Sequence, residues 1–429
     1  MKIILKNINI LNPYYKIDLK NKDVVIEGGI ITDISENLKP DKTAKVFDFT
    51  NKYLLPGFLD MHVHLREPGR EDEETILTGC NAAAEGGFTE IACMPNTNPA
   101  IDSAEVISLI KQKSRGCLVN VHPIAAASLG RNGEVIAPMG ELVEAGAVGF
   151  SDDGAPIKTA NILKRALEYT LMYNTPVIDH CEDDSLLGGS MNEGLNSTFL
   201  GLLPIPSVSE DIMVMRDILM AEYTGGKLHI AHISTKNAVD MVREAKKKGI
   251  NVTAEAAPHH FTLTDDSLKT YDSNYKMSPP LRSKEDLEAV LEGLRDGTID
   301  CIASDHAPHS IEEKEVEFEY APNGILGLET EVGLTLSELY YKKILTLEQV
   351  IEKLAINPRK VLNLPIPKPE VGEKANFTIL DIDQVWTYDV SKHRSKSINT
   401  PFDKRLFSGK AIAVLNNCKM LSNNDLIDI

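Results

Sequence analysis

The 429-residue sequence lacks most features that mark secreted, membrane or nucleic-acid-binding proteins. Its six cysteines are scattered and form no C-x-x-C pair, which indicates reduced core thiols and not a disulfide framework. No apolar run approaches the roughly 20 residues of a membrane-spanning helix, and the N-terminus carries charge too early for a signal peptide. The formal net charge of −18 argues against a nucleic-acid or anionic-membrane surface. We therefore expect a cytoplasmic protein.

No G-x-G-x-x-G phosphate loop follows the first strand, and this absence weighs against a doubly wound open sheet. What the sequence has instead is an alternation of apolar strands and helical segments. The eight candidate strands lie at residues 54–62, 90–94, 118–124, 147–151, 177–180, 228–233, 251–255 and 301–304. Eight such units over roughly 250–300 residues predict an α/β fold, a (β/α)8 TIM-like barrel, with the open sheet as the alternative.

The two ends of the chain differ from the middle because they contain short strands and little helix. Neither end can bury both faces of its strands alone, and separate flanking hairpins would be marginally stable in water. We therefore predict one small β-sandwich domain formed by both termini, residues 1–52 plus 366–429. The barrel, residues 53–365, is inserted between them.

Metal-binding residue types follow five of the eight predicted strands, at the end of a barrel where chemistry takes place. They are His62-Val63-His64, Ser151-Asp152-Asp153, Asp179-His180-Cys181-Glu182, His229-Ile230-Ala231-His232 and Asp305-His306-Ala307-Pro308-His309. Residues two apart on a strand share a face, so His62 and His64 can bind one ion. Imidazole and carboxylate ligands suit zinc or another divalent first-row ion, and this many ligands suit two ions sharing a carboxylate. Such a pair activates water and polarises a carbonyl, which is the chemistry of amide hydrolysis or its reverse.

Two longer motifs, Asp60–Pro68 and Ala303–His309 with Lys314 beyond, resemble the signatures of the dihydroorotases, a family of the amidohydrolase superfamily. Met94–Thr97, Asp179–Glu182, Pro279–Arg282 and Gly327–Thr330 match the same family in the same order. The resemblance covers essentially the whole chain and is strongest to the class I enzymes of bacteria. It implies the reversible, metal-dependent cyclisation of N-carbamoyl-L-aspartate to (S)-dihydroorotate with loss of water, in de novo pyrimidine biosynthesis.

The resemblance also implies a site for two zinc ions per subunit. The implied ligands are His62, His64 and Asp305 for the first ion, His180 and His232 for the second, and Asp153 as the bridge. Asp152 is the competing choice for the bridge, and Lys158 in the following loop is expected to be solvated. A bridging hydroxide attacks the ring amide, and Asp305 is the implied acid/base that moves the proton to the departing nitrogen.

The resemblance further implies contacts to the substrate from His64, Arg66, Asn96, Ser278, His309, Asn323 and Gly324. The guanidinium of Arg66 offers a bidentate fork for the substrate carboxylate, held together with Asn96 and His309. Ser278 and Asn323 depart from the asparagine and phenylalanine usual at these positions. Backbone contacts at Asn323 do not depend on its side chain, whereas a side-chain contact at Ser278 does.

Two other functions stay open. A hydantoinase- or allantoinase-like cyclic amidase is disfavoured by Arg66, and a non-catalytic regulatory homologue is disfavoured by the complete ligand set. Two protein partners also stay open, a second copy of the chain and aspartate carbamoyltransferase. Five further histidines are expected to be neighbours of the site or structural, namely His122, His229, His259, His260 and His306. The acidic run 312–317 is expected to be a solvated loop near the mouth.

Overall fold

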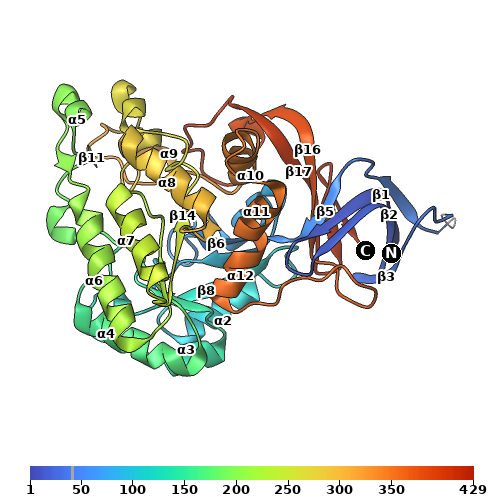
Figure 1. Ribbon diagram of the computed structural model, residues 1–429, viewed down its shortest axis with the longest axis horizontal. Helices are drawn as coiled ribbons and strands as arrows, with labels where there is room; N and C mark the ends of the chain where they lie inside the picture. The colour runs from blue at the N-terminus through green and yellow to red at the C-terminus, as the bar shows by residue number, and fades with distance from the viewer. Residues whose placement is uncertain (40–42) are drawn as a thin grey trace.

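Two large sheets organise the chain in the computed structural model, which describes residues 1–39 and 43–429 (Figure 1). Residues 40–42, within the N-terminal part of the predicted β domain, lie outside the described residues. The middle of the chain forms an eight-stranded sheet surrounded by helices, and both termini contribute to a nine-stranded sheet at one end of the molecule. Within the described ranges, no helix is long and apolar enough to cross a membrane.

The eight-stranded sheet is parallel throughout and nearly closed. Its strands are β6 (Phe58–Val63), β7 (Phe88–Cys93), β8 (Asn120–Ala126), β9 (Gly149–Ser151), β10 (Val177–Asp179), β13 (Leu228–Ile230), β14 (Val252–Ala256) and β15 (Cys301–Ile302). Val63 forms a parallel bridge with His306 just after β15, so the last strand meets the first. The predicted barrel is confirmed, and every predicted barrel strand overlaps an observed one.

Helices follow most of these strands and cover the barrel. They are α1 (Ile76–Gly86), α2 (Ala104–Lys113), α3 (Met139–Ala145), α4 (Ala160–Thr170), α6 (Val208–Thr224), α7 (Lys236–Lys247) and α8 (Lys284–Asp296), with the shorter α9 (Ile311–Lys314), α10 (Glu331–Thr335), α11 (Leu347–Ile351) and α12 (Asn357–Leu362) later in the chain. The side chain of Thr75 caps α1 by accepting from the Thr78 amide, and Gly87 ends it in the left-handed region. Between β10 and α6, the chain makes an excursion through β11 (Met191–Asn192), α5 (Leu195–Leu200) and β12 (Pro204–Ile205).

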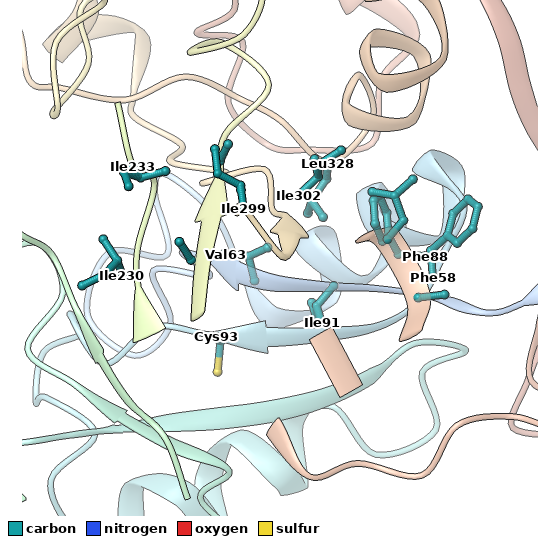
Figure 2. Close-up of a cluster of buried hydrophobic side chains, with 14 of the residues drawn as sticks. Phe58, Val63, Phe88, Ile91, Cys93, Ile230, Ile233, Ile299, Ile302 and Leu328 are labelled. Carbon is teal, nitrogen blue, oxygen red and sulfur yellow. The ribbon is translucent and has the colours of Figure 1, made fainter. Parts of the chain in front are cut away.

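Apolar side chains fill the barrel and its surroundings in two layers. Figure 2 shows the layer between strands and helices, where Phe58 and Phe88 lie with ring centroids 6.2 Å apart. On β7, Ile91 and Cys93 belong to this layer, whereas Ala92 between them joins a separate inner cluster. Alternate strand positions therefore face alternate sides, as expected of a barrel whose interior is filled by side chains.

The termini build one sheet with its own apolar core. Its strands are β1 (Lys2–Asn12), β2 (Ile17–Glu27), β3 (Ile30–Ser35), β4 (Lys45–Asp48), β5 (Tyr53–Pro56), β16 (Phe377–Thr387), β17 (Leu406–Asn416), β18 (Lys419–Ser422) and β19 (Asp425–Asp428). The two ends of the chain are joined where β16 pairs antiparallel with β5, and the termini lie close together in Figure 1.

The run expected to form the first barrel strand is divided between the two sheets. β5 pairs with β1 and β16 of the terminal sheet, and β6 begins the barrel. Gly57 lies at the crossing, where a Cβ atom would stand 2.1 Å from Thr89 Oγ1 and 2.2 Å from Asn376 Oδ1. Only glycine lets the chain pass between the two sheets this closely.

Candidate metal centre

His62 and His64 lie at the end of β6, both buried, with their ring centroids 5.4 Å apart. Both Nε2 atoms face one oxygen of Asp153, with distances to Oδ2 of 3.4 Å from His62 and 3.5 Å from His64. Two ligands of a tetrahedral zinc ion, each about 2.1 Å from the metal, lie roughly 3.4 Å apart. The three side chains therefore have the spacing of ligands that share an ion.

A second histidine pair faces the other oxygen of the same carboxylate. Asp153 Oδ1 lies 3.6 Å from His180 Nδ1 and 3.5 Å from His232 Nε2. The ligand atoms of each trio, one built on His62 and His64 and one on His180 and His232, all lie within 4.8 Å of one another. Asp153 is common to both trios, so its two oxygens are placed as a carboxylate bridge would place them.

Asp305 adds a fourth side chain to the first trio, from the segment after β15 that runs beside the end of β6. Its Oδ1 lies 3.1 Å from His64 Nε2 and 3.5 Å from His62 Nε2. Asp305 has a φ of 48°, and His232 has a φ of 30°, both in the left-handed region that non-glycine residues rarely adopt. Backbone strain of this kind is concentrated at functional sites, where the surrounding structure holds it in place.

Two atoms at the centre of this cluster have the surroundings of metal ligands. Within the described chain, buried His62 Nε2 and Asp153 Oδ1 have no hydrogen-bond partner, although buried polar atoms normally have one. Burial alone would raise the pKa of the Asp153 carboxyl, but the positive histidines around it hold that pKa well below its usual range. Burial alone would likewise lower the pKa of His180, which Asp153 and Glu182 raise to about 10. The donor set therefore attracts positive charge, and divalent ions would satisfy it.

Each histidine except His232 is oriented from behind by an oxygen. His62 Nδ1 lies 2.6 Å from Glu255 Oε1, His64 Nδ1 lies 2.8 Å from Asn96 Oδ1, and His180 Nε2 lies 3.0 Å from Glu182 Oε2. Such contacts fix ring orientation and strengthen metal ligands. Glu255 was not among the site residues predicted from the sequence. It stands at the end of the seventh predicted strand, where the chemistry of a barrel takes place, so this position could have indicated it.

The two candidates for the bridge have different surroundings. Both oxygens of Asp152 are occupied by Ser128, whose amide lies 3.0 Å from Oδ1 and whose hydroxyl lies 2.6 Å from Oδ2. Asp153, in contrast, faces both histidine pairs. Lys158 is exposed, as expected. The geometry favours Asp153 as the bridge.

The cluster opens into a cavity of about 330 Å³. Its lining includes His64, Arg66, Asn96, Asp153, His180, His232, Ser278, Asp305, His309 and Asn323. Of the predicted site residues, only His62 and Gly324 are absent from this lining. His62 is fully buried. Gly324 lies against His309, which does line the cavity, because a Cβ atom at Gly324 would stand 2.7 Å from His309 Cδ2.

Arg66 and His309 lie together in the lining of this cavity. Arg66 Nε donates to the Pro308 carbonyl over 3.0 Å, and its Nη2 lies 3.3 Å from His309 Nε2. Glu73 holds both side chains, with distances of 3.1 Å to Arg66 Nε and 2.9 Å to His309 Nδ1. Ser278 Oγ donates to Glu182 over 2.6 Å, so this serine supports the partner of His180.

The acidic run 312–317 is not solvated throughout, and the expectation is wrong for Lys314. This lysine is 5 % exposed and lies at the end of α9. Its Nζ donates to the carbonyls of Pro322 and Gly324, over 3.0 and 3.2 Å, on either side of Asn323. A single lysine among glutamates in the sequence gives no indication that its side chain is buried.

The other histidines lie mostly around the site, as expected. His229 Nε2 lies 3.1 Å from Glu255 Oε2, His260 Nε2 lies 3.0 Å from the Pro279 carbonyl, and His306 Nε2 lies 3.3 Å from Glu74 Oε2. His122 differs, because its Nε2 lies 2.6 Å from Glu90, whose other oxygen binds Arg359 and Asn376 near the terminal sheet.

Comparisons with known proteins identify relatives of this chain. A family model described as dihydro-orotase-like matches residues 51–238. The chain is 48 % identical to a dihydroorotase of Syntrophus aciditrophicus (strain SB) over 429 residues, covering 99 % of this chain and 100 % of that protein. It is 48 % identical to a dihydroorotase of Pelotomaculum thermopropionicum over 428 residues, covering 100 % of both.

Solved structures show the same fold at lower identity. An L-hydantoinase (dihydropyrimidinase) from Arthrobacter aurescens has a TM-score of 0.87 and 23 % identity, covering 100 % of this chain and 97 % of that one. A dihydropyrimidinase from Brevibacillus agri NCHU1002 has a TM-score of 0.86 and 24 % identity, with coverage of 100 % and 96 %. At these identities the likeness establishes the fold, a barrel with a terminal sheet, and does not identify the substrate.

Proposed function

The chain belongs to the dihydroorotase family, and we propose that it catalyses the reversible cyclisation of N-carbamoyl-L-aspartate to (S)-dihydroorotate. One observation carries the proposal: a carboxylate between two histidine pairs shares a cavity with a guanidinium. The histidines and Asp153 would hold metal ions beside the amide of the substrate, and the guanidinium of Arg66 would bind its carboxylate. A hydantoin ring has no carboxylate for this arginine to bind, so the geometry favours dihydroorotate.

His62, His64 and Asp305 would hold one zinc ion, His180 and His232 the other, and Asp153 both. A pair of ions bound there supplies an activated water and Lewis acidity toward a carbonyl oxygen. The positive charge also makes the cavity attractive to an anionic substrate, in spite of the net charge of −18 on the whole chain. Two zinc ions per chain are thus part of the proposal.

Asp305 is the proposed acid/base. In the hydrolytic direction its carboxylate accepts the proton of the attacking water and then donates it to the departing ring nitrogen. Burial would raise the pKa of this carboxyl, but His62 and His64 hold it well below its usual range, so it is ionised and ready to accept. In the biosynthetic direction the same oxygen takes the proton from the carbamoyl nitrogen as the ring closes.

The substrate carboxylate would lie against Arg66, His309 and Asn96. Glu73 orients the first two, and the Asn96 side chain is fixed by its contact with His64. The backbone of Asn323 and Gly324 closes the same end, since the Asn323 carbonyl lies 2.8 Å from His309 Nε2. We include Ser278 through its hydrogen bond to Glu182.

The proposal is tested by measuring dihydroorotate hydrolysis and metal content on one preparation. We expect turnover of dihydroorotate with hydantoin and allantoin at least 100-fold poorer, and zinc near two ions per chain. Asp305→Asn should abolish turnover while the circular dichroism spectrum stays unchanged. Full activity of Asp305→Asn would refute its role, and faster turnover of hydantoin than of dihydroorotate would refute the substrate.

We also place the enzyme in the cytoplasm, where the six cysteines, all free, would stay reduced. A small-molecule substrate is the partner that the reaction requires. Association with a second copy of the chain and association with aspartate carbamoyltransferase stay predictions from the sequence.

A further inference from the structure

A cavity of about 710 Å³ between the barrel and the terminal sheet has two of the six cysteines in its wall. Cys80 comes from the middle of α1, and Cys117 comes from the segment between α2 and β8. The terminal sheet contributes Leu421 of β18 and Leu426 of β19. We call this space the Cys80–Cys117 cavity. It shares no lining residue with the cavity at the metal cluster, so the proposed reaction does not use it.

The wall of the Cys80–Cys117 cavity is positively charged, although the chain as a whole carries a net charge of −18. Its charged side chains are four cations, Lys113, Arg115, Arg394 and Lys419, and one carboxylate, Glu67. Glu67 is paired with Lys113 over 2.9 Å, which leaves three positive charges in the wall. Small-molecule sites have volumes of about 300–1,000 Å³, and this cavity is within that range. The charge therefore favours a small anionic ligand.

The two thiols contact each other and differ in their surroundings. Cys80 is buried, whereas Cys117 is partly exposed. A hydrogen bond with Cys80, assisted by the charge of Lys419, lowers the pKa of the Cys117 thiol to about 7 against the effect of burial. The same contact, together with burial, raises the pKa of Cys80. An accessible thiolate beside positive charge is a reactive cysteine, and a second thiol in contact with it is placed to resolve a mixed disulfide.

We propose that Cys117 is the residue at which small anionic disulfides react with this protein, and that Cys80 is the resolving thiol. Cys117 Sγ attacks one sulfur of the disulfide R–S–S–R, and the departing sulfur leaves as R–SH with the proton that Cys117 gave up. The mixed disulfide Cys117–S–S–R remains. Cys80 Sγ then attacks Cys117 Sγ, and the second R–S⁻ departs with the proton of Cys80. The protein loses two electrons and two protons, the disulfide becomes two R–SH, and the new bond joins α1 to the segment before β8.

Cys418 provides an internal comparison, because accessibility alone predicts the opposite order of reaction. Cys418 is exposed and does not line the Cys80–Cys117 cavity, whereas Cys117 is only partly exposed. If exposure controlled the rate, Cys418 would react before Cys117. If the charge of the cavity and the neighbouring thiol control it, Cys117 reacts first.

The first test exposes the reduced full-length protein to 5,5′-dithiobis(2-nitrobenzoate), a disulfide with two carboxylates. We expect Cys117 to react about tenfold faster than Cys418, measured by peptide mapping after an acid quench. In the wild type, the Cys80 and Cys117 peptides should become joined, with the mass of two hydrogen atoms lost. In Cys80→Ala, the mixed disulfide at Cys117 should persist. Faster reaction at Cys418 would overturn the site, and a persistent mixed disulfide at Cys117 of the wild type would overturn the role of Cys80.

The second test removes positive charge from the wall of the cavity. Arg115→Gln combined with Lys419→Gln should slow the anionic probe about fivefold more than the neutral disulfide 2,2′-dithiodipyridine. Lys284→Gln combined with Arg295→Gln on α8 is the matched control, because both side chains are exposed, do not line the cavity and carry the same total charge. The control should leave both rates at Cys117 unchanged, and circular dichroism reports folding of each variant. Equal slowing of the two probes by the cavity variant would overturn the selection for negative charge.

Discussion

Replacing Glu255 by glutamine tests whether the residues behind the histidines set metal affinity. Glu255 is fully buried on β14, and its two oxygens face His62 Nδ1 at 2.6 Å and His229 Nε2 at 3.1 Å. Burial would raise the pKa of this carboxyl, yet the two histidines lower it to about 2, so it carries a full negative charge. Glutamine keeps the size and one acceptor but removes that charge.

The expected loss follows from the position of His62. A carboxylate behind a metal-bound imidazole fixes its tautomer and raises its basicity, and losing such a partner costs about 10–100-fold in metal affinity or activity. That factor corresponds to about 1.4–2.7 kcal/mol. Because the Glu255 carboxylate contacts His62 and His229, and not His180 or His232, the loss should fall mainly on the ion that His62 and His64 bind.

The assay is zinc affinity by chelator competition, with dihydroorotate turnover at saturating and limiting zinc. Glu90→Gln is the matched control, because Glu90 Oε2 also lies 2.6 Å from a histidine, His122 Nε2, but away from the metal cluster. Glu90→Gln should lower the unfolding temperature and leave zinc affinity unchanged. Equal zinc affinity in Glu255→Gln and the wild type would refute the reasoning.

Two further predictions concern the bridge and the loop at residues 322–324. Asp153→Asn should remove at least one zinc ion per chain by elemental analysis, whereas Asp152→Asn should keep both ions and only lower the unfolding temperature. Lys314→Met should raise KM for dihydroorotate about tenfold with a smaller change in kcat, because two hydrogen bonds of about 1 kcal/mol each no longer hold that loop. Burial lowers the pKa of Lys314 from 10.5 to about 7. Between these pH values the unfolded state holds a proton on Lys314 that the folded state has lost, so the free energy of unfolding increases as pH rises. The unfolding temperature of wild type relative to Lys314→Met should therefore rise from pH 7 to 10, and a constant difference would contradict the burial of a titrating amine.

The sequence predicted the strands, and it predicted which histidines and aspartates come together, because both depend largely on short-range periodicity. His62 and His64 share a face through the two-residue period of a strand, and parallel strands of a barrel bring their ends to one mouth. Glu255 was missed because its contact with His62 joins β14 to β6, and that contact depends on the curvature of the whole sheet. Lys314 was misjudged for a similar reason, since only the folded loop shows which carbonyls it meets.

The contacts that close the barrel also bring the residues of the site together. Val63 bridges to His306, and Arg66, three residues after Val63, donates to the carbonyl of Pro308, two residues after His306, so the segments after β6 and β15 run side by side. This pairing sets Asp305 against His62 and His64 and brings Arg66 into the lining of the same cavity. If Arg66 binds the substrate carboxylate as proposed, substrate choice in this chain depends on a residue just beyond the closing bridge and not on the ligand set alone.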